Sequence, residues 1–212
     1  MKLYDYAASG NCFKVRLLLA LLGRDYERIP IDIFAGDTLT EDYGRINPLR
    51  ETPVLELDGG ERIAQSNAIL WYLAEDTPFL PASRLERAQV LQWLSFEQER
   101  IMVGVGGTRF RRLTGRAELD PEADARRFAT GTDALAVLDA HLAGRSFVVG
   151  DTSTIADLSL FGYTAVAPDA GLELGPNVAA WIERVRALPG FVDDLEPYPE
   201  SARPGQGRSI YG

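Results

Sequence analysis

The segment 52–68 constrains the fold most, because it joins a proline entry, two short strands and a helix start. Its sequence is TPVLELDGGERIAQSNA. Pro53 cannot donate a hydrogen bond to a neighbouring strand, so it belongs at a strand's first position, and a cis X-Pro bond costs only about 0.5–1 kcal/mol. The apolar runs 54–57 and 62–64 flank a DGGE turn, the strongest hairpin signal in the chain. The sequence therefore predicts a β-hairpin, entered through a Thr52–Pro53 bond for which cis is accessible.

A helix is predicted directly after this hairpin. Apolar residues recur at helical spacing over 67–75, and Gln65-Ser66 precedes them. Ser66 is expected to be the N-cap, and the N–H groups of a helix start form a site for a carboxylate. In the alternative, Ser66 only caps its own helix and Pro53 only ends a sheet edge.

The rest of the first part of the chain alternates strand and helix. We expect a strand at 2–6, a helix at 11–22 closed by Gly23, and a strand at 26–32. The stretch Thr77–Pro81 then interrupts every period. These patterns predict a small α/β layer that ends near residues 78–85.

Only helical patterns follow that boundary. One long helix is expected over 84–112, weakened by three glycines that could permit a bend or close packing. Further helices are expected from Asp120-Pro121 to about His141, from a capping box at Thr154 and Asp157, and over 177–188. His141 is expected to cap the end of its helix rather than act as a base. The tail from Pro197 is expected to be irregular.

Composition excludes several functional classes. The chain has 212 residues, of which 46% are hydrophobic, so it can build substantial cores. Its net charge of −9 argues against nucleic acid or an anionic membrane surface as a partner, and the arginines between 109 and 116 are too local to reverse this. No segment has the pattern of a signal peptide or a membrane span, and the single cysteine forms no intrachain disulfide. A cytoplasmic protein is expected.

Four motifs taken together resemble the glutathione S-transferase family, in the bacterial type with serine at the thiol-activating position. They are Ser9–Leu17 after the first strand, Asn47-Pro48 ahead of Thr52-Pro53-Val54, Gln65–Ile69, and Gly150–Asp157. The resemblance implies an α/β thioredoxin-like N-terminal domain over 1–80 and an all-α helical C-terminal domain over 85–212. It also implies a homodimeric detoxification enzyme that uses glutathione as co-substrate and needs no metal.

Ser9 and Asn11 are the catalytic residues that the resemblance implies. A free thiol has a pKa near 8.5, and lowering it by about two units requires about 2.7 kcal/mol of preferential interaction with the thiolate. Hydrogen bonds from the Ser9 hydroxyl and the Asn11 amide, each worth about 1.5–3 kcal/mol to a charged group, could supply this. The alternative role for either residue is simple N-capping.

Cys12 raises a second possibility. Ser9-Gly10-Asn11-Cys12 has the spacing of a C-x-x-C redox motif whose first cysteine is replaced by serine. Cys12 shares a helix face with Val15, Leu18 and Leu19, which favours a buried apolar role. If it were exposed, it could form a mixed disulfide with glutathione.

The resemblance also implies the remaining contacts to glutathione. The backbone of Thr52, next to Pro53, should pair with the cysteinyl part, while Gln65 and Ser66 should hold the γ-glutamyl end. Thr38 is a candidate for the glycine carboxylate. The chain departs from the family pattern after Asn47-Pro48-Leu49, where Arg50 and Glu51 replace a glycine and a neutral or basic residue. Arg50 could attract a carboxylate and Glu51 would repel one.

The second substrate is expected near Met102, Arg109 and Phe110 on the long helix, although each could equally be core or solvated surface. An arginine beside an aromatic ring can hold an acidic or electrophilic co-substrate. Two functions remain open. One is an enzyme that transfers glutathione to a small electrophile or a mixed disulfide, and the other is a non-catalytic module that binds a ligand or a protein partner.

Overall fold

A computed structural model describes residues 1–211, and their contacts divide into two compact units. The first unit contains residues 1–73 and 192–211, and the second contains residues 74–191. The sequence assigned the tail to the helical domain 85–212, whereas the contacts place it with the α/β unit. Gly212, the last residue of that predicted domain, lies outside the described residues.

The first unit is built on a four-stranded mixed sheet in the order β2-β1-β3-β4. The strands are β1 (Lys2–Asp5), β2 (Glu27–Pro30), β3 (Val54–Glu56) and β4 (Arg62–Ala64). β1 pairs parallel with β2 and antiparallel with β3, and the β3–β4 hairpin confirms the DGGE turn. The parallel pair requires a crossover, which α1 supplies.

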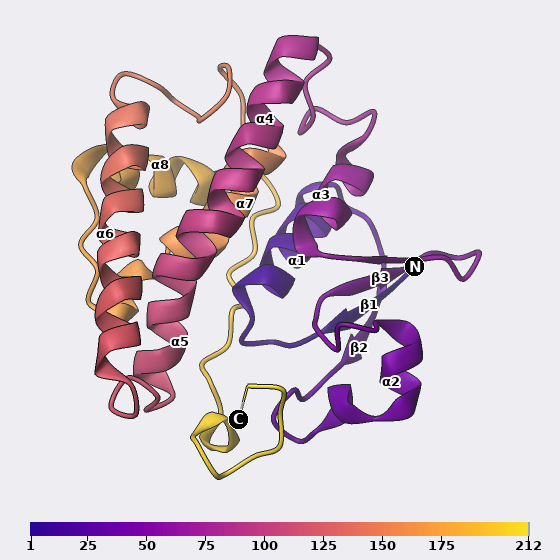
Figure 1. Cartoon of the computed structure of the whole chain (residues 1–212). Helices are drawn as coiled ribbons and strands as arrows, with labels where there is room; N and C mark the ends of the chain where they lie inside the picture. The colour runs from indigo at the N-terminus through magenta and orange to yellow at the C-terminus, as the bar shows by residue number, and fades with distance from the viewer. Residues whose placement is uncertain (212) are drawn as a thin grey trace. The chain divides into compact units, whose positions relative to one another are not determined.

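Three helices complete this unit. They are α1 (Gly10–Leu21), α2 (Glu41–Ile46) and α3 (Ser66–Ala74), with a short 3-10 turn η1 (Asp37–Leu39) before α2. α1 and α3 lie on one side of the sheet and α2 lies on the other (Figure 1). The sequence missed α2, because its six residues are too few to show a clear helical period. This arrangement confirms the predicted thioredoxin-like fold.

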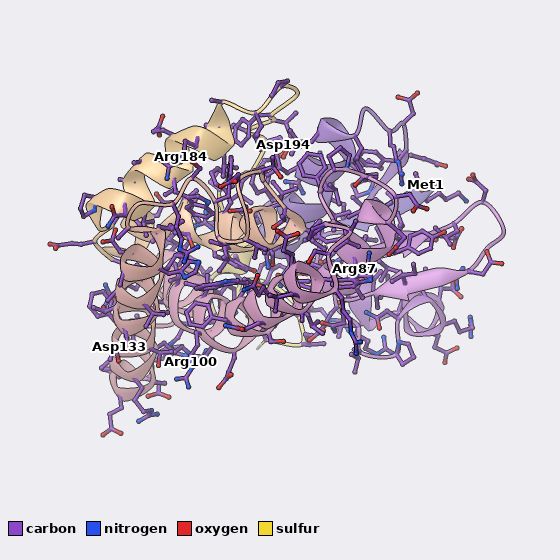
Figure 2. The ribbon with its side chains drawn as sticks, turned by 90° about the horizontal axis from the view of Figure 1, so that it is seen from above. Met1, Arg87, Arg100, Asp133, Arg184 and Asp194 are labelled. Atoms are coloured by element: carbon purple, nitrogen blue, oxygen red, sulfur yellow. The ribbon has the colours of Figure 1, made fainter. Side chains whose placement is uncertain are left out.

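The second unit is entirely helical. Its elements are α4 (Arg84–Phe96), the π-helical segment η2 (Glu97–Gly106), α5 (Gly107–Leu113), α6 (Pro121–Leu142), α7 (Ile155–Thr164), η3 (Ala167–Ala170) and α8 (Pro176–Arg186). The π-helical segment falls inside the predicted long helix. A Cβ at Gly104 would clash with the backbone of Gly131 in α6, so this glycine serves close packing. Charged side chains such as Arg100 and Asp133 project outward from this unit (Figure 2).

The tail returns to the α/β unit after residue 191. It carries the short 3-10 helix η4 (Glu200–Ala202) and is otherwise irregular, as predicted. The Arg208 N–H donates to the Phe34 carbonyl at 2.7 Å, and Asp194 forms an ion pair of 2.9 Å with Arg16 of α1. These contacts fix both parts of the tail to the unit. No helix among residues 1–211 is long and apolar enough to cross a membrane.

Candidate active site

Ser9 is the N-cap of α1. Its oxygen accepts a hydrogen bond from the Cys12 N–H at 3.3 Å, and the residue is half-buried. The capping role considered from the sequence is therefore present. It does not exclude a second role, because the cap uses only a lone pair of the oxygen, and the O–H group, which also reaches the Cys12 sulfur, can donate.

Asn11 is held by two donors on its carbonyl oxygen. Lys14 Nζ donates to Asn11 Oδ1 at 2.9 Å, and the Ser66 hydroxyl donates to the same atom at 3.2 Å. Two donors on the oxygen fix which way the amide faces and leave its nitrogen to donate elsewhere. The bond from Ser66 also brings together two motifs that lie 55 positions apart in the sequence.

Cys12 is completely buried, which confirms the apolar role predicted from its helix face. Its sulfur accepts from the Tyr6 N–H at 3.4 Å. Burial raises the pKa of the Cys12 thiol to about 12, and the nearby Asp5 carboxylate acts in the same direction. At neutral pH the group is a thiol out of solvent contact, so the alternative of an exposed redox cysteine is wrong.

The Thr52–Pro53 bond is cis, and side-chain hydrogen bonds hold the loop that precedes it. The Glu51 carbonyl accepts from the Tyr43 hydroxyl at 2.9 Å and from the Asn47 side chain at 2.8 Å. Among residues 1–211, no protein group forms a hydrogen bond with the backbone N–H or C=O of Thr52. Both groups therefore remain for an extended peptide.

Gln65 and Ser66 start α3, but in different roles from those predicted. The Ile69 N–H donates to the Gln65 carbonyl at 3.0 Å, and Ser66 is already the first helical residue. The N-cap position therefore belongs to Gln65, and the prediction of Ser66 as N-cap is wrong by one residue. Gln65 has a left-handed backbone with φ of 72°, which turns the chain sharply from β4 into the helix.

The Arg50 side chain joins loops of this unit by hydrogen bonds. Its Nη1 donates to the carbonyls of Thr38 and Thr40 at 2.7 and 2.8 Å. Its φ of 57° lies in the left-handed region, which explains why the family pattern has glycine at this position. The Thr38 hydroxyl is buried, so in this conformation it does not face a ligand from solvent.

Glu51 is the acidic residue at the start of the hairpin segment. Its carboxylate accepts from the Gln65 side-chain amide at 3.3 Å. Glu51, which would repel a ligand carboxylate, therefore contacts Gln65, which is expected to bind the γ-glutamyl end of glutathione. This contact can hold the Gln65 side chain in place at the expense of one of its donors.

The three residues expected at the second substrate all lie in the helical unit. Arg109 is buried and pairs with Asp169 at 3.3 Å, while Phe110 lies under the guanidinium of Arg116 at 4.8 Å. Met102 is half-buried on η2. These contacts give Arg109 and Phe110 packing roles, and their part in substrate binding stays a prediction.

His141 lies in the last turn of α6, yet it does not cap that helix. Its Nε2 bonds to the Val148 carbonyl at 2.8 Å, and its ring packs on Trp93 with centroids 4.5 Å apart. It joins α6 to the loop that follows. Among residues 1–211, no group of three or more histidine, cysteine, aspartate or glutamate side chains could hold a metal ion.

A mixed sheet with a cis proline before β3, joined to a helical unit, defines a thioredoxin-like protein with an added helical part. Two family models match the chain. They are "Glutathione S-transferase, N-terminal domain" over residues 8–76 and "Glutathione S-transferase, C-terminal domain" over residues 115–189. The chain belongs to the glutathione S-transferase family. This confirms the predicted family, fold and enzyme class, and leaves the reaction subtype open.

Three relatives indicate the range of this family. A glutathione S-transferase structure from Pseudomonas fluorescens is 40% identical, with a TM-score of 0.89 over 92% of this chain and 98% of that one. Maleylacetoacetate isomerase from Rhizobium meliloti is 32% identical over 95% of this chain and 97% of the relative. A glutathione transferase from Burkholderia graminis, solved with two glutathione molecules per subunit, is 26% identical, with a TM-score of 0.78 over 89% of this chain and 84% of that one.

Proposed function

We propose that the α/β unit binds glutathione and activates its thiol as a thiolate. The observation that carries this proposal is the position of Asn11, whose oxygen is occupied by Lys14 and Ser66 while its amide nitrogen is left to donate. Ser9, two residues earlier, has an O–H group that can turn toward a ligand sulfur as well as toward the Cys12 sulfur. Two donors at the start of α1 are what a developing thiolate requires.

The rest of the peptide is assigned to the groups that the fold leaves open. The backbone of Thr52, beside Pro53, pairs with the cysteinyl part of glutathione, and the γ-glutamyl carboxylate binds at the start of α3 near Gln65 and Ser66. A carboxylate is favoured at a helix start, because the free N–H groups there point toward it. The Burkholderia graminis relative with bound glutathione supports this family use of the peptide.

The reaction then follows from the thiolate. Its sulfur attacks the electrophilic atom of a small co-substrate, a new bond to sulfur forms, and the leaving group departs with its electron pair. With a mixed disulfide, the sulfur attacks one sulfur and the other leaves as a thiolate. No protein residue becomes covalently modified, which agrees with the burial of Cys12.

The test is a titration of bound glutathione, followed by the ultraviolet absorbance of its thiolate, in wild type and in Ser9→Ala. One lost charge-assisted hydrogen bond should raise the thiol pKa by about 1–2 units. Ser83→Ala is the matched control, because Ser83 caps α4 in the same way and lies in the helical unit. Tight binding with an unshifted thiol pKa in wild type would instead indicate a non-catalytic binding module.

A panel of co-substrates then separates the reaction subtypes. It contains chlorodinitrobenzene, a peroxide, a mixed disulfide and a maleyl compound, the last because one relative is named maleylacetoacetate isomerase. Turnover of one class identifies the subtype. If none of the four co-substrates is turned over, glutathione binding would remain possible but the proposed chemistry would not be supported.

A homodimer in the cytoplasm is part of the same proposal. Several large apolar side chains are exposed, among them Leu49 before the hairpin, Tyr72 on α3, and Leu85 and Leu91 on α4. Such side chains are candidates for a covered face. Sedimentation equilibrium of wild type and of Leu91→Asp tests this, since a monomeric wild type would remove the dimer from the proposal.

A further inference from the structure

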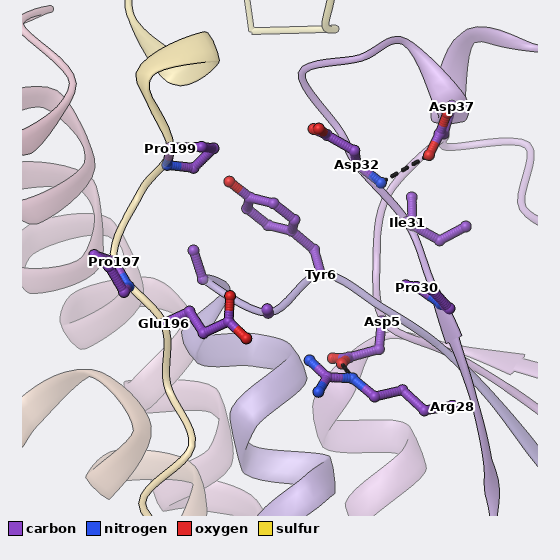
Figure 3. A pocket seen from close by; sticks show the side chains of 12 residues that line it. Asp5, Tyr6, Arg28, Pro30, Ile31, Asp32, Asp37, Glu196, Pro197 and Pro199 are labelled. Carbon is purple, nitrogen blue, oxygen red and sulfur yellow. Dashed lines mark hydrogen bonds and ion pairs between the residues drawn. The ribbon is translucent and has the colours of Figure 1, made fainter.

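A pocket of about 460 Å³ lies within the α/β unit, between the loop after β1, the loop after β2 and the tail. Its volume falls within the range of small-molecule sites, which is about 300–1,000 Å³. The tail segment 196–199 forms one wall (Figure 3). The Glu196 N–H donates to the Ala7 carbonyl at 3.2 Å, and the Arg208 N–H holds the tail to Phe34 further on. This wall is therefore fixed at both ends.

Tyr6 is the polar group that marks this pocket. The residue is 6% exposed, and its hydroxyl is buried without a hydrogen-bond partner. Figure 3 shows the ring projecting between Pro199 and Asp32, so the hydroxyl is aimed into the pocket. Phe34 packs edge-on against the ring at 6.0 Å and holds its orientation. A buried hydroxyl without a partner is costly, and a ligand that bonds to it would remove that cost.

The charges around Tyr6 select the sign of such a ligand. Asp5 is already neutralised, because Arg16 pairs with it at 2.6 Å and Arg28 pairs with its other oxygen. The lining residues Asp32 and Glu196 form no ion pair among residues 1–211, and the same holds for Asp37. Arg28 also lines the pocket, but it is paired with Asp5, so the carboxylates of Asp32, Asp37 and Glu196 outnumber the lining cations and give the pocket a negative potential.

The Tyr6 hydroxyl oxygen can accept a hydrogen bond from a cation, and its O–H can donate one to a carboxylate. Burial raises the pKa of its hydroxyl, and the charges of Tyr198, Asp32 and Glu196 act in the same direction. The group is therefore a protonated phenol at neutral pH.

We propose that this pocket, which we call the Tyr6 pocket, binds a small organic ammonium ion. The ammonium N–H groups bond to the Tyr6 oxygen and to the carboxylates of Asp32 and Glu196, while Pro197, Pro199 and Ile31 contact the apolar stem. The Tyr6 pocket begins beside Ala8, the residue before Ser9, yet its occupation requires no glutathione. Its test can therefore be made without glutathione, separately from that of the proposed transferase reaction.

The test compares three probes of equal length and different charge, n-hexylammonium, n-hexanol and n-hexanoate. Their binding to the full chain without glutathione is measured by ligand-observed NMR. We expect saturable binding of the ammonium probe and no saturation with the other two. Equal binding of hexanol, or preference for hexanoate, would overturn the proposal, as would the absence of saturable ammonium binding.

Variants locate the bound probe. Tyr6→Phe should weaken ammonium binding by about 10-fold, because one hydrogen bond to a charged group is lost. Glu196→Gln should weaken it by about 3-fold, the size expected for an exposed ion pair. Asp193→Asn removes the same charge from the same tail outside the pocket, and it should leave the affinity unchanged. Thermal melts verify that each variant is folded.

Two outcomes would place the ammonium ion elsewhere. One is a loss in Asp193→Asn equal to that in Glu196→Gln, which would mean that the whole acidic surface attracts the probe. The other is unchanged affinity in a folded Tyr6→Phe variant. Either result would overturn the proposal, whatever the outcome of the glutathione experiments.

Discussion

The starts of α1 and α7 both have an N-cap side chain, but they differ in how many of their polar groups are bonded to protein. At α7, Thr154 and Asp157 form a closed capping box, and Asp157 also accepts from Val148 N–H at 3.0 Å and from the Trp181 indole at 2.9 Å. At α1, Ser9 accepts one bond, and Asn11 keeps its amide nitrogen for another partner. The difference teaches that a helix start whose side chains are fully bonded to protein serves the fold, while one with donors left over is available for chemistry.

The largest effect is expected at the closed helix start. Asp157→Ala removes a buried carboxylate and leaves the Val148 N–H and the Trp181 indole without an acceptor. The free energy of unfolding should fall by about 3–5 kcal/mol. Urea denaturation followed by circular dichroism measures it. Asp157→Asn is the matched control, which retains one acceptor oxygen and should lose less.

A loss below about 1 kcal/mol in Asp157→Ala would contradict the comparison. It would mean that water or a rearranged loop satisfies the freed donors. The capping box would then contribute no more than an ordinary N-cap.

Cys12 extends the comparison to the α/β unit, where a buried thiol lies beside the side chains of Ser9 and Asn11 that have donors left over. The folded thiol has a pKa of about 12, above its unfolded value. The folded state therefore binds the proton more tightly, and its contribution to stability is complete below about pH 8.5. As the pH rises further, that contribution falls by about 1.4 kcal/mol per pH unit.

Two measurements examine this prediction. Iodoacetamide should label Cys12 rapidly only in denaturant. The alkaline loss of unfolding free energy should also be less steep in Cys12→Ala than in wild type, although Tyr6 and Tyr43, whose pKa values are raised by burial as well, keep some slope. Rapid labelling of the native protein would place a reactive thiol at the site and revive the redox alternative.

Asn11→Asp separates the two halves of one side chain. The new carboxylate keeps an oxygen for Lys14 and Ser66, so the fold should be retained. The amide donor is replaced by a negative oxygen, which repels a thiolate. The kcat/KM for glutathione conjugation should fall about 10- to 100-fold, equivalent to one charge-assisted hydrogen bond.

The pH profile of that reaction distinguishes the catalytic role from a structural one. In Asn11→Asp its acidic limb should move to higher pH, because the thiol of bound glutathione loses a stabilising donor. An unchanged limb with a raised KM would assign Asn11 to binding alone.

The sequence predicted most of the fold because its signals are local. The DGGE turn, Pro53, the Thr154–Asp157 box and the Asp120-Pro121 helix start each act over a few residues, and each is present in the structure. The N-cap was predicted one position too late, at Ser66. Gln65 provides the cap through its carbonyl and a left-handed backbone, which a glutamine side chain does not indicate in the sequence.

The parts of the site that could not be predicted depend on distant contacts. The bonds from Ser66 and Lys14 to Asn11 require the folded packing of α3 against α1. The Tyr6 pocket needs the tail to return to the first unit, and nothing in the local pattern near Tyr6 indicates its partner segment. In the sequence, Tyr6 resembles an ordinary apolar aromatic position, and the irregular tail has no clear place in either unit. No sequence signal therefore connects the two.

The smallest change in the free energy of unfolding is expected at Arg50, which lies between the proposed glutathione site and the loops that its side chain joins. Arg50→Gly restores the family pattern and relieves a left-handed backbone worth roughly 1 kcal/mol. It also removes two bonds of the guanidinium to the Thr38 and Thr40 carbonyls, each worth about 1 kcal/mol or less where exposed. The two changes oppose each other, so the free energy of unfolding should change by less than about 1 kcal/mol.

Arg50→Ala is the matched control, because it loses the same bonds without the backbone relief and should be the less stable of the two. Glutathione titrations of both variants then show whether the guanidinium also attracts the ligand, since an affinity loss common to Gly and Ala, at unchanged stability in Gly, would assign Arg50 to the binding site rather than to joining loops alone.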